Sequence, residues 1–142
     1  MTPDETARRA AEALWAEDNV PRSLGMELVE IGPGRATLAM IVGPGMTNGH
    51  GICHGGYVFL LADSACAFAC HTHGSRWVTQ YAQVNFLAPG RLGARLTAEA
   101  VERHRGERSG LTDVTVRDEH GATIAEFRGA SRTIAGSLPT TA

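Results

Sequence analysis

The stretch Asn48-Gly-His-Gly-Ile-Cys-His-Gly-Gly56 leads directly into an apolar segment, residues 57–70, that contains a single carboxylate, Asp63. Residues 54–73 are apolar on nearly every face, and a helix of that kind must be buried on most sides. A glycine-rich helix start leaves backbone N–H groups free to bind a developing negative charge. A buried carboxylate is costly unless it is paired or used. This stretch therefore predicts one central helix and suggests acyl chemistry.

The segments around this helix predict a sheet. Residues 4–17 carry alanine and leucine at helical spacing after a Thr2-Pro3-Asp4 start, which indicates a short N-terminal helix. Short apolar or alternating runs bounded by glycine and proline turns predict strands at 26–31, 36–42, 77–87, 95–103, 111–117 and 122–134. The order argues against alternating βαβ units. We expect an α+β fold in which one antiparallel sheet wraps around the central helix.

Composition sets broad limits on the function. The chain has 142 residues, enough for one domain with a real core, and a net charge of −2, so nothing global suggests nucleic acid. It contains no lysine, so phosphate recognition would depend on arginine, histidine or backbone amides. No membrane span or signal peptide is expected. Three cysteines without a disulfide-framework spacing favour the cytoplasm.

The element order and the motif Gly51-Ile-Cys-His54-Gly55-Gly56, followed after six intervening residues by Asp63, resemble the hotdog-fold acyl-CoA thioesterases. The likeness is strongest to the phenylacetic-acid-degradation (PaaI) branch. It implies a six-stranded antiparallel sheet around one long helix, dimers whose sheets are continuous, and commonly a homotetramer. We expect residues 1–23 to form the N-terminal helix and connector, 24–136 the hotdog thioesterase domain, and 137–142 a frayed tail.

The resemblance also implies roles for individual residues. Gly55 would supply the N–H that polarises the thioester carbonyl, and Asp63 would be the nucleophile or general base. Asn48 and His54 would support and orient the site, and Thr79 falls where some relatives place a hydroxyl that assists the attacking water.

Helix geometry adds a constraint that needs only those two roles. Gly55 and Asp63 are eight positions apart, which on one helix is roughly 12 Å. One carbonyl cannot contact both groups at that separation. If both act on one carbonyl, they come from different subunits, and the spacing predicts a composite dimer site.

Each of these residues also has a simpler interpretation. Asp63 could pair with a buried arginine or lie on an exposed stripe of the helix. His54 could only cap or pack, and Asn48 could be the left-handed residue of an Asn-Gly turn.

Two further clusters have alternatives. The four residues Cys66, Cys70, His71 and His73 match no common zinc spacing, and a helical cysteine is usually a small hydrophobic residue, so we expect no metal. The late arginines form either a solvated rim or a contact with coenzyme A phosphates. The predicted substrate-binding residues are Gly56, Arg103, Arg105 and Arg128.

The resemblance implies a thioester hydrolase that converts an acyl-CoA, such as phenylacetyl-CoA or hydroxyphenylacetyl-CoA, to a free acid and coenzyme A. No separate cofactor is expected, because coenzyme A is part of the substrate. The alternatives are a hotdog enoyl-CoA hydratase or dehydratase, and a non-catalytic acyl-CoA-binding protein.

Overall fold

The computed structural model describes residues 1–140 of the chain. Its elements, in chain order, are α1 (Pro3–Glu17), α2 (Asn19–Ser23), β1 (Glu27–Gly32), β2 (Arg35–Ile41), η1 (Pro44–Met46), α3 (Gly55–His71), β3 (Ser75–Phe86), β4 (Arg95–Arg105), β5 (Ser109–Arg117) and β6 (Thr123–Ser137). The central helix and the six strands all occur where the sequence predicts them, with ends that differ by at most three residues.

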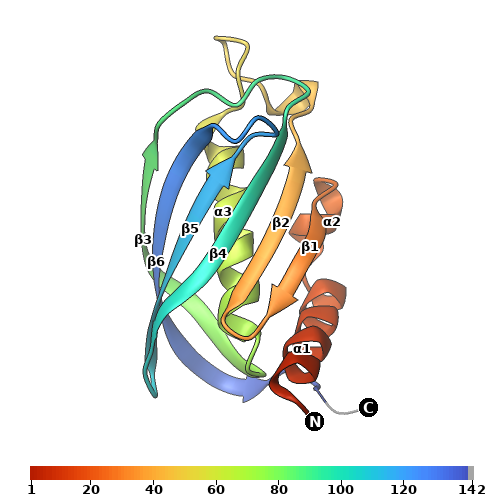
Figure 1. Ribbon diagram of the computed structural model, residues 1–142, viewed down its shortest axis with the longest axis vertical. Coiled ribbons are helices and arrows are strands. Elements are labelled where there is room, and N and C mark those ends of the chain that lie inside the picture. The colour runs from red at the N-terminus through yellow and green to blue at the C-terminus, as the bar shows by residue number, and fades with distance from the viewer. Residues whose placement is uncertain (141–142) are drawn as a thin grey trace.

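The six strands form one antiparallel sheet in the order β1-β2-β4-β5-β6-β3. The sheet curves around α3, which packs on its inner face, and α1 lies beside the β1 edge (Figure 1). This arrangement confirms the predicted α+β fold. Strand β3 is at the other edge, so one side of a twelve-residue strand has no neighbour within the described chain.

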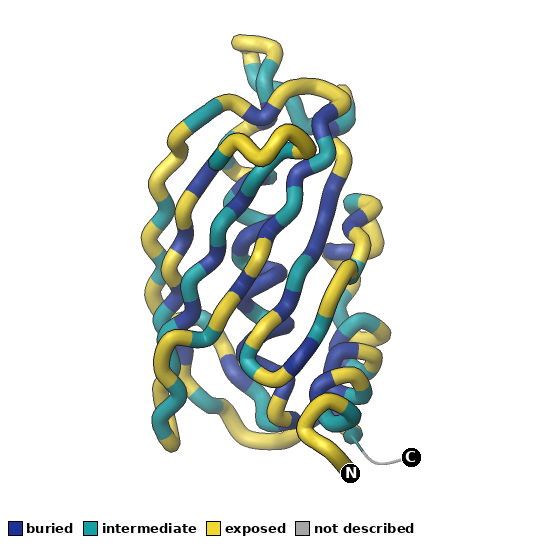
Figure 2. The backbone as a smooth tube through the Cα atoms, viewed as in Figure 1, coloured by how far each residue is buried: buried dark blue, intermediate teal, exposed yellow. Residues whose placement is uncertain are grey.

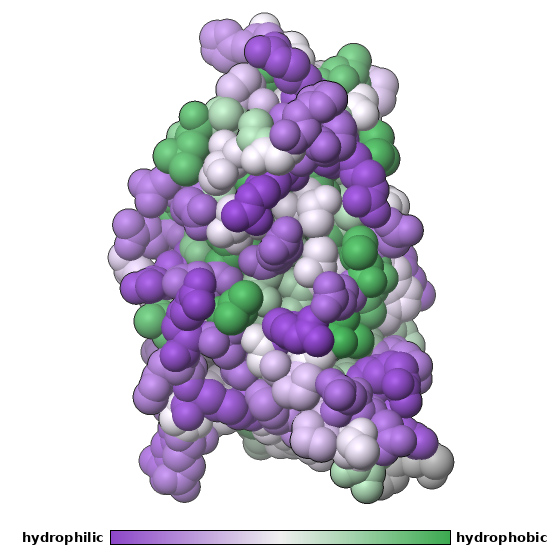
Figure 3. All heavy atoms as spheres, in the orientation of Figure 1, coloured by the Kyte–Doolittle hydropathy of each residue, from purple (hydrophilic) through white to green (hydrophobic). Residues whose placement is uncertain are grey.

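The core lies between α3 and the inner face of the sheet. On β4, the buried residues Leu96, Ala98 and Ala100 alternate with exposed Glu99 and Val101. Buried positions also recur at every second residue along β5 and in the middle of β6 (Figure 2). Small side chains on β4 let the helix lie close to the sheet. The outer face of the sheet is mostly hydrophilic (Figure 3), as the period of two requires.

The predicted start of α1 is confirmed by its cap. The Thr2 hydroxyl accepts the Glu5 N–H at 3.2 Å, and the Thr2 N–H donates to the Glu5 carboxylate at 2.7 Å, which completes a capping box. The following short helix α2 was not predicted. Pro21 occupies its first turn, where a backbone N–H has no partner within a helix, so a proline there does not prevent helix formation.

The prediction of a frayed tail from residue 137 is wrong for its first two residues. Strand β6 continues to Ser137, and Leu138 is 2% exposed. The Leu138 N–H donates to the Gly74 carbonyl at 2.7 Å, which holds this segment against the chain just before β3. The part of the prediction that concerns residues 141–142 lies outside the described residues.

Candidate active site

The N-terminus of α3 leaves one backbone donor unused. The His54 Nδ1 atom caps the helix by accepting the Gly56 N–H at 3.0 Å, and the His54 carbonyl accepts the Tyr57 N–H at 2.9 Å. Within residues 1–140, the Gly55 N–H has no acceptor. The positive end of the helix dipole lies at the same place. Gly55 therefore offers a hydrogen-bond donor for an oxyanion, whereas the N–H of Gly56, predicted to bind substrate, is engaged by His54.

Asn48 stabilises the loop that precedes the helix. Its side-chain oxygen accepts the His50 N–H at 2.9 Å and the Ile52 N–H at 3.4 Å, and its own N–H donates to the Ile52 carbonyl at 2.8 Å. Asn48 is not the left-handed residue of the turn, because every described residue with positive φ is a glycine, and here it is Gly51 at 75°. The Asn-Gly turn interpretation is wrong, and Asn48 supports the loop that carries His54.

Asp63 lies in the middle of α3 and is half-buried. Burial raises the pKa of its carboxyl group, the Asp18 carboxylate raises it further, and a hydrogen bond with the Thr79 side chain partly offsets both effects. The structure thus brings the predicted residues Asp63 and Thr79 together. Asp63 forms no ion pair with any residue in the described range, so it is not the partner of a buried arginine.

A pocket of about 460 Å³ opens beside Gly55. Its apolar lining comes from the loop before α3, the helix itself, the end of β3 with the segment that follows it, and the start of β6. It includes Ile52, Val58, Phe86, Leu87, Ala88 and Ile124. The ring of Phe86 lies over Gly55: a β-carbon added there would be 3.0 Å from the ring. No sequence pattern indicated this contact, because Phe86 is 31 positions further along the chain.

Cys70 and His71 on α3 have structural partners. Cys70 Sγ is 3.6 Å from the Thr112 hydroxyl and 3.5 Å from the Ser131 hydroxyl. His71 is 2.6 Å from the Ala67 carbonyl through Nδ1 and accepts the Trp77 N–H at 3.2 Å through Nε2. No set of three potential metal ligands occurs among the residues that the structure describes.

Cys66 makes a close contact with Gly129 on β6. A β-carbon on Gly129 would lie 2.8 Å from the Cys66 Sγ and 3.6 Å from the Thr79 methyl carbon. The neighbouring Cys70 thiol raises the pKa of the Cys66 thiol most, and burial raises it further. The Cys66 thiol therefore stays protonated. A glycine inside a predicted strand is the sequence signal that could have indicated this close approach.

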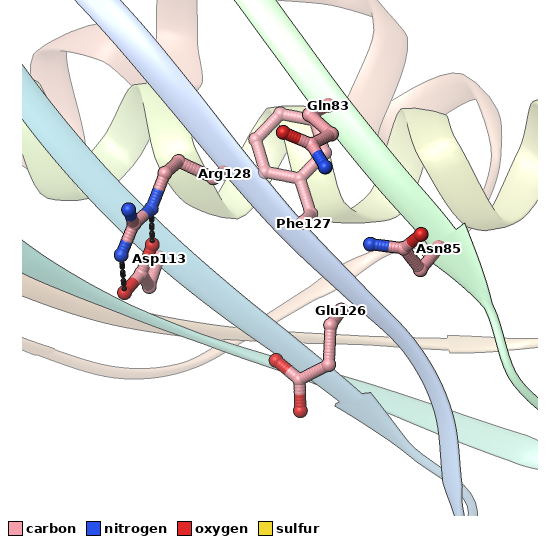
Figure 4. A pocket seen from close by; sticks show the side chains of 6 residues that line it. All are labelled: Gln83, Asn85, Asp113, Glu126, Phe127 and Arg128. Carbon is pink, nitrogen blue, oxygen red and sulfur yellow. Dashed lines mark hydrogen bonds and ion pairs between the residues drawn. The ribbon is translucent and has the colours of Figure 1, made fainter.

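The three predicted substrate-binding arginines lie away from Gly55. Arg103 and Arg128 both pair with Asp113 on the outer face of the sheet, at 3.1 Å and 2.6 Å. Arg128 borders a second pocket, of about 280 Å³, together with Gln83 (Figure 4).

Arg105 lies at the opposite end of α3 from Gly55. Its guanidinium donates to the Cys70 carbonyl, the Glu102 carboxylate and the Ser75 hydroxyl at 3.0–3.3 Å, and it stacks over Trp77 at 4.9 Å. These contacts give Arg105 a structural role at the C-terminus of the helix.

None of the helices in the described part of the chain is long and apolar enough to cross a membrane.

Comparisons with known proteins agree with this fold. A family model described as the thioesterase superfamily matches residues 50–125. The chain is 38% identical over 128 residues to the acyl-coenzyme A thioesterase PaaI of Escherichia coli K12, covering 90% of this chain and 91% of that protein. The solved structure of the E. coli PaaI protein from the phenylacetic acid degradation operon matches with a TM-score of 0.95 at 36% identity, over 97% of this chain and 100% of that one.

A Streptococcus mutans protein bound to acetyl-CoA matches with a TM-score of 0.77 at 25% identity, over 80% of this chain and 91% of that one. The fold and the matches together define the class as a thioester hydrolase with the hotdog fold. The chain belongs to the thioesterase superfamily, and its resemblance to the PaaI branch is confirmed.

Proposed function

We propose that the protein hydrolyses acyl-CoA thioesters at a site shared by two subunits. One observation carries the proposal: the free Gly55 N–H and the unpaired Asp63 carboxylate lie on the same helix, roughly 12 Å apart. In a dimer, Gly55 of one subunit faces Asp63 of the other. The names of the relatives support the substrate class, because one is an acyl-CoA thioesterase and another binds acetyl-CoA.

The chemistry follows from the two groups. Asp63 either takes a proton from a water molecule that attacks the thioester carbonyl or attacks that carbonyl itself. In both cases the carbonyl oxygen becomes an oxyanion, and the Gly55 N–H and the helix dipole stabilise it. Collapse of this intermediate breaks the C–S bond and expels coenzyme A as a thiolate. Attack by water yields the free acid directly, and attack by Asp63 yields an anhydride that a water molecule then hydrolyses.

Thr79 and His54 support this arrangement. The Thr79 side chain lowers the pKa of Asp63 and so favours the ionised carboxylate, which both versions of the mechanism require. His54 engages the Gly56 N–H, which fixes the first turn of the helix and leaves Gly55 as the free donor. The reaction needs only water and the substrate, so we propose no cofactor beyond the coenzyme A of the substrate.

The unpaired edge of β3 supports the dimer. A long exposed strand edge is a template for pairing with another chain, and β3 also exposes Val78 (45%) and Tyr81 (64%). Pairing of two β3 strands would join the sheets and bring the two α3 helices side by side.

The proposal also includes assembly as a homotetramer and a location in the cytoplasm. The three cysteines are free and buried, which is compatible with a reducing compartment.

We propose phenylacetyl-CoA or hydroxyphenylacetyl-CoA as the substrate, from the likeness to PaaI. For the coenzyme A phosphates, Arg103 and Arg128 remain the better candidates, since their side chains are 57% and 54% exposed. Arg105 is 28% exposed and its donors are engaged within the chain.

Asp63→Asn tests the chemistry. Thiol release from an acyl-CoA panel should fall by at least about a hundredfold, whereas Asp4→Asn, at an exposed position on α1, should keep full activity. The variant should remain folded, because the raised pKa of Asp63 means that its ionised form disfavours folding at neutral pH. Unchanged turnover in Asp63→Asn would refute the assignment.

Hydration of an enoyl-CoA without thiol release would favour the hydratase or dehydratase alternative. Tight binding of acyl-CoA without turnover would favour the non-catalytic binding protein.

Gly55→Pro tests the donor and the composite site. Proline is tolerated at the first position of a helix and has no N–H, and Gly55→Ala is the control that adds the same β-carbon but keeps the N–H. We expect thiol release to fall further in the proline variant than in the alanine variant, because only proline removes the N–H.

Mixing Gly55→Pro and Asp63→Asn subunits should restore about a quarter of wild-type activity, because half of the dimers are mixed and each has one intact site. A site within one chain would show no recovery.

A further inference from the structure

The pocket beside Gly55 has an unusual wall. Phe86 ends β3 with 54% of its surface exposed, which is high for a phenylalanine in a folded domain. Its ring atoms lie 3.0–3.5 Å from the position that a β-carbon on Gly55 would occupy. The ring therefore covers the first residue of α3, and glycine at position 55 makes this approach possible. Phe86 stands directly beside the free N–H that the proposed reaction uses.

The chemistry of the pocket distinguishes the two arms of a thioester. Asn48 is its one amide side chain, and its oxygen already accepts the N–H groups of His50 and Ile52. The pantetheine arm of coenzyme A carries two amides, which would lose hydrogen bonds with water in such a place. An apolar acyl group has no such requirement, and pockets of about 460 Å³ are within the size range for small ligands.

We propose that this pocket receives the acyl group and that Phe86 determines which acyl groups are accepted. The inference depends on the proposed thioesterase function and deepens it. A phenyl ring attached near the carbonyl can meet the Phe86 ring edge-to-face, a contact that an acetyl group cannot make. The substrate class is thus a thioester with an aromatic or medium-length apolar acyl group, and short acyl groups are poorer substrates.

The experiment compares kcat/KM for phenylacetyl-CoA, hexanoyl-CoA and acetyl-CoA in the wild type and in two variants. Phe86→Ala should lower the preference for phenylacetyl over acetyl by about tenfold. Phe86→Leu keeps apolar bulk, so it should retain the preference for hexanoyl-CoA and lose only the aromatic preference. Leu92→Ala, at a 55% exposed position in the turn before β4, is the matched control and should leave the ratios unchanged.

The outcomes separate this inference from the proposed function. If the wild type hydrolyses none of the thioesters, the proposed function fails. If the wild type is active and Phe86→Ala lowers kcat/KM equally for all three, the pocket holds the coenzyme A arm and the inference is wrong. Unchanged ratios would also overturn it. If Phe86→Ala fails to assemble, Phe86→Leu alone decides, through the loss or retention of the aromatic preference.

Discussion

Replacing Gly129 with alanine should destabilise the protein through one defined contact. The new β-carbon would lie 2.8 Å from the Cys66 Sγ, about 0.6 Å short of ordinary van der Waals contact, and 3.2 Å from the Phe127 ring. Cys66 is fully buried on α3, so it has little room to move. Overpacking of this kind typically costs about 1–3 kcal/mol. For a chain of this length, that corresponds to a fall in Tm of roughly 3–10 °C.

Thermal unfolding at a fixed protomer concentration measures this cost, because assembly changes Tm with concentration. The same glycine substitution made in a Cys66→Ala background should cost less than about 1 kcal/mol, since the sulfur atom is then absent. Gly45→Ala is the matched control: nothing lies within 4 Å of its added β-carbon, and we expect no loss of stability.

An equal loss in both backgrounds would refute the reasoning, because the sulfur would then play no part in the cost. A loss in Gly45→Ala as large as in Gly129→Ala would also refute it. In that case the effect would belong to any glycine replacement rather than to the contact between β6 and α3.

Two further predictions concern the C-terminal half of α3. Burial lowers the pKa of His71 below its ordinary value of 6.5, so its neutral form contributes stability above that pH and the contribution is lost as the pH falls. Urea unfolding between pH 7 and pH 5 should therefore show a smaller loss of stability in His71→Gln than in the wild type, and equal slopes would contradict this. Arg105→Lys should cost about 1–2 kcal/mol, because lysine cannot reproduce the forked donors or the stacking on Trp77. The control Arg103→Lys should cost little, since Arg103 is 57% exposed, and similar values for the two variants would show that the contacts of Arg105 add nothing.

The fold could be predicted wherever a local pattern has a single interpretation. The central helix was predicted because residues 54–73 are too apolar for a surface helix, and strand β4 because its buried residues alternate. The C-terminal segment was predicted wrongly, because it offers a single leucine among small residues. Leu138 is buried in the core, and its N–H donates to the carbonyl of Gly74, 64 positions earlier in the chain.

The residues of the candidate site could also be predicted only in part. The residue types drew attention to the glycine-rich helix start and to Asp63, and the resemblance assigned Gly55 and Asp63 their roles. The fixed rise per residue of a helix then gave the separation between them. The pairing of Thr79 with Asp63 came from the resemblance, and the structure brings the two together. The three arginines were chosen by charge alone, and charge does not tell which of them already has a partner within the fold.

The sequence by itself determined the helix, its glycine-rich start, its single acid and the separation between them, because these depend on neighbours along the chain and on fixed helical geometry. Only the tertiary structure decided that Phe86 covers Gly55, that Cys66 fits against Gly129, and that the Gly55 N–H is the donor left free. These features arise where β3 and β6 close on the helix. Such contacts join residues that are far apart in the chain, and their geometry depends on how all the strands pack together.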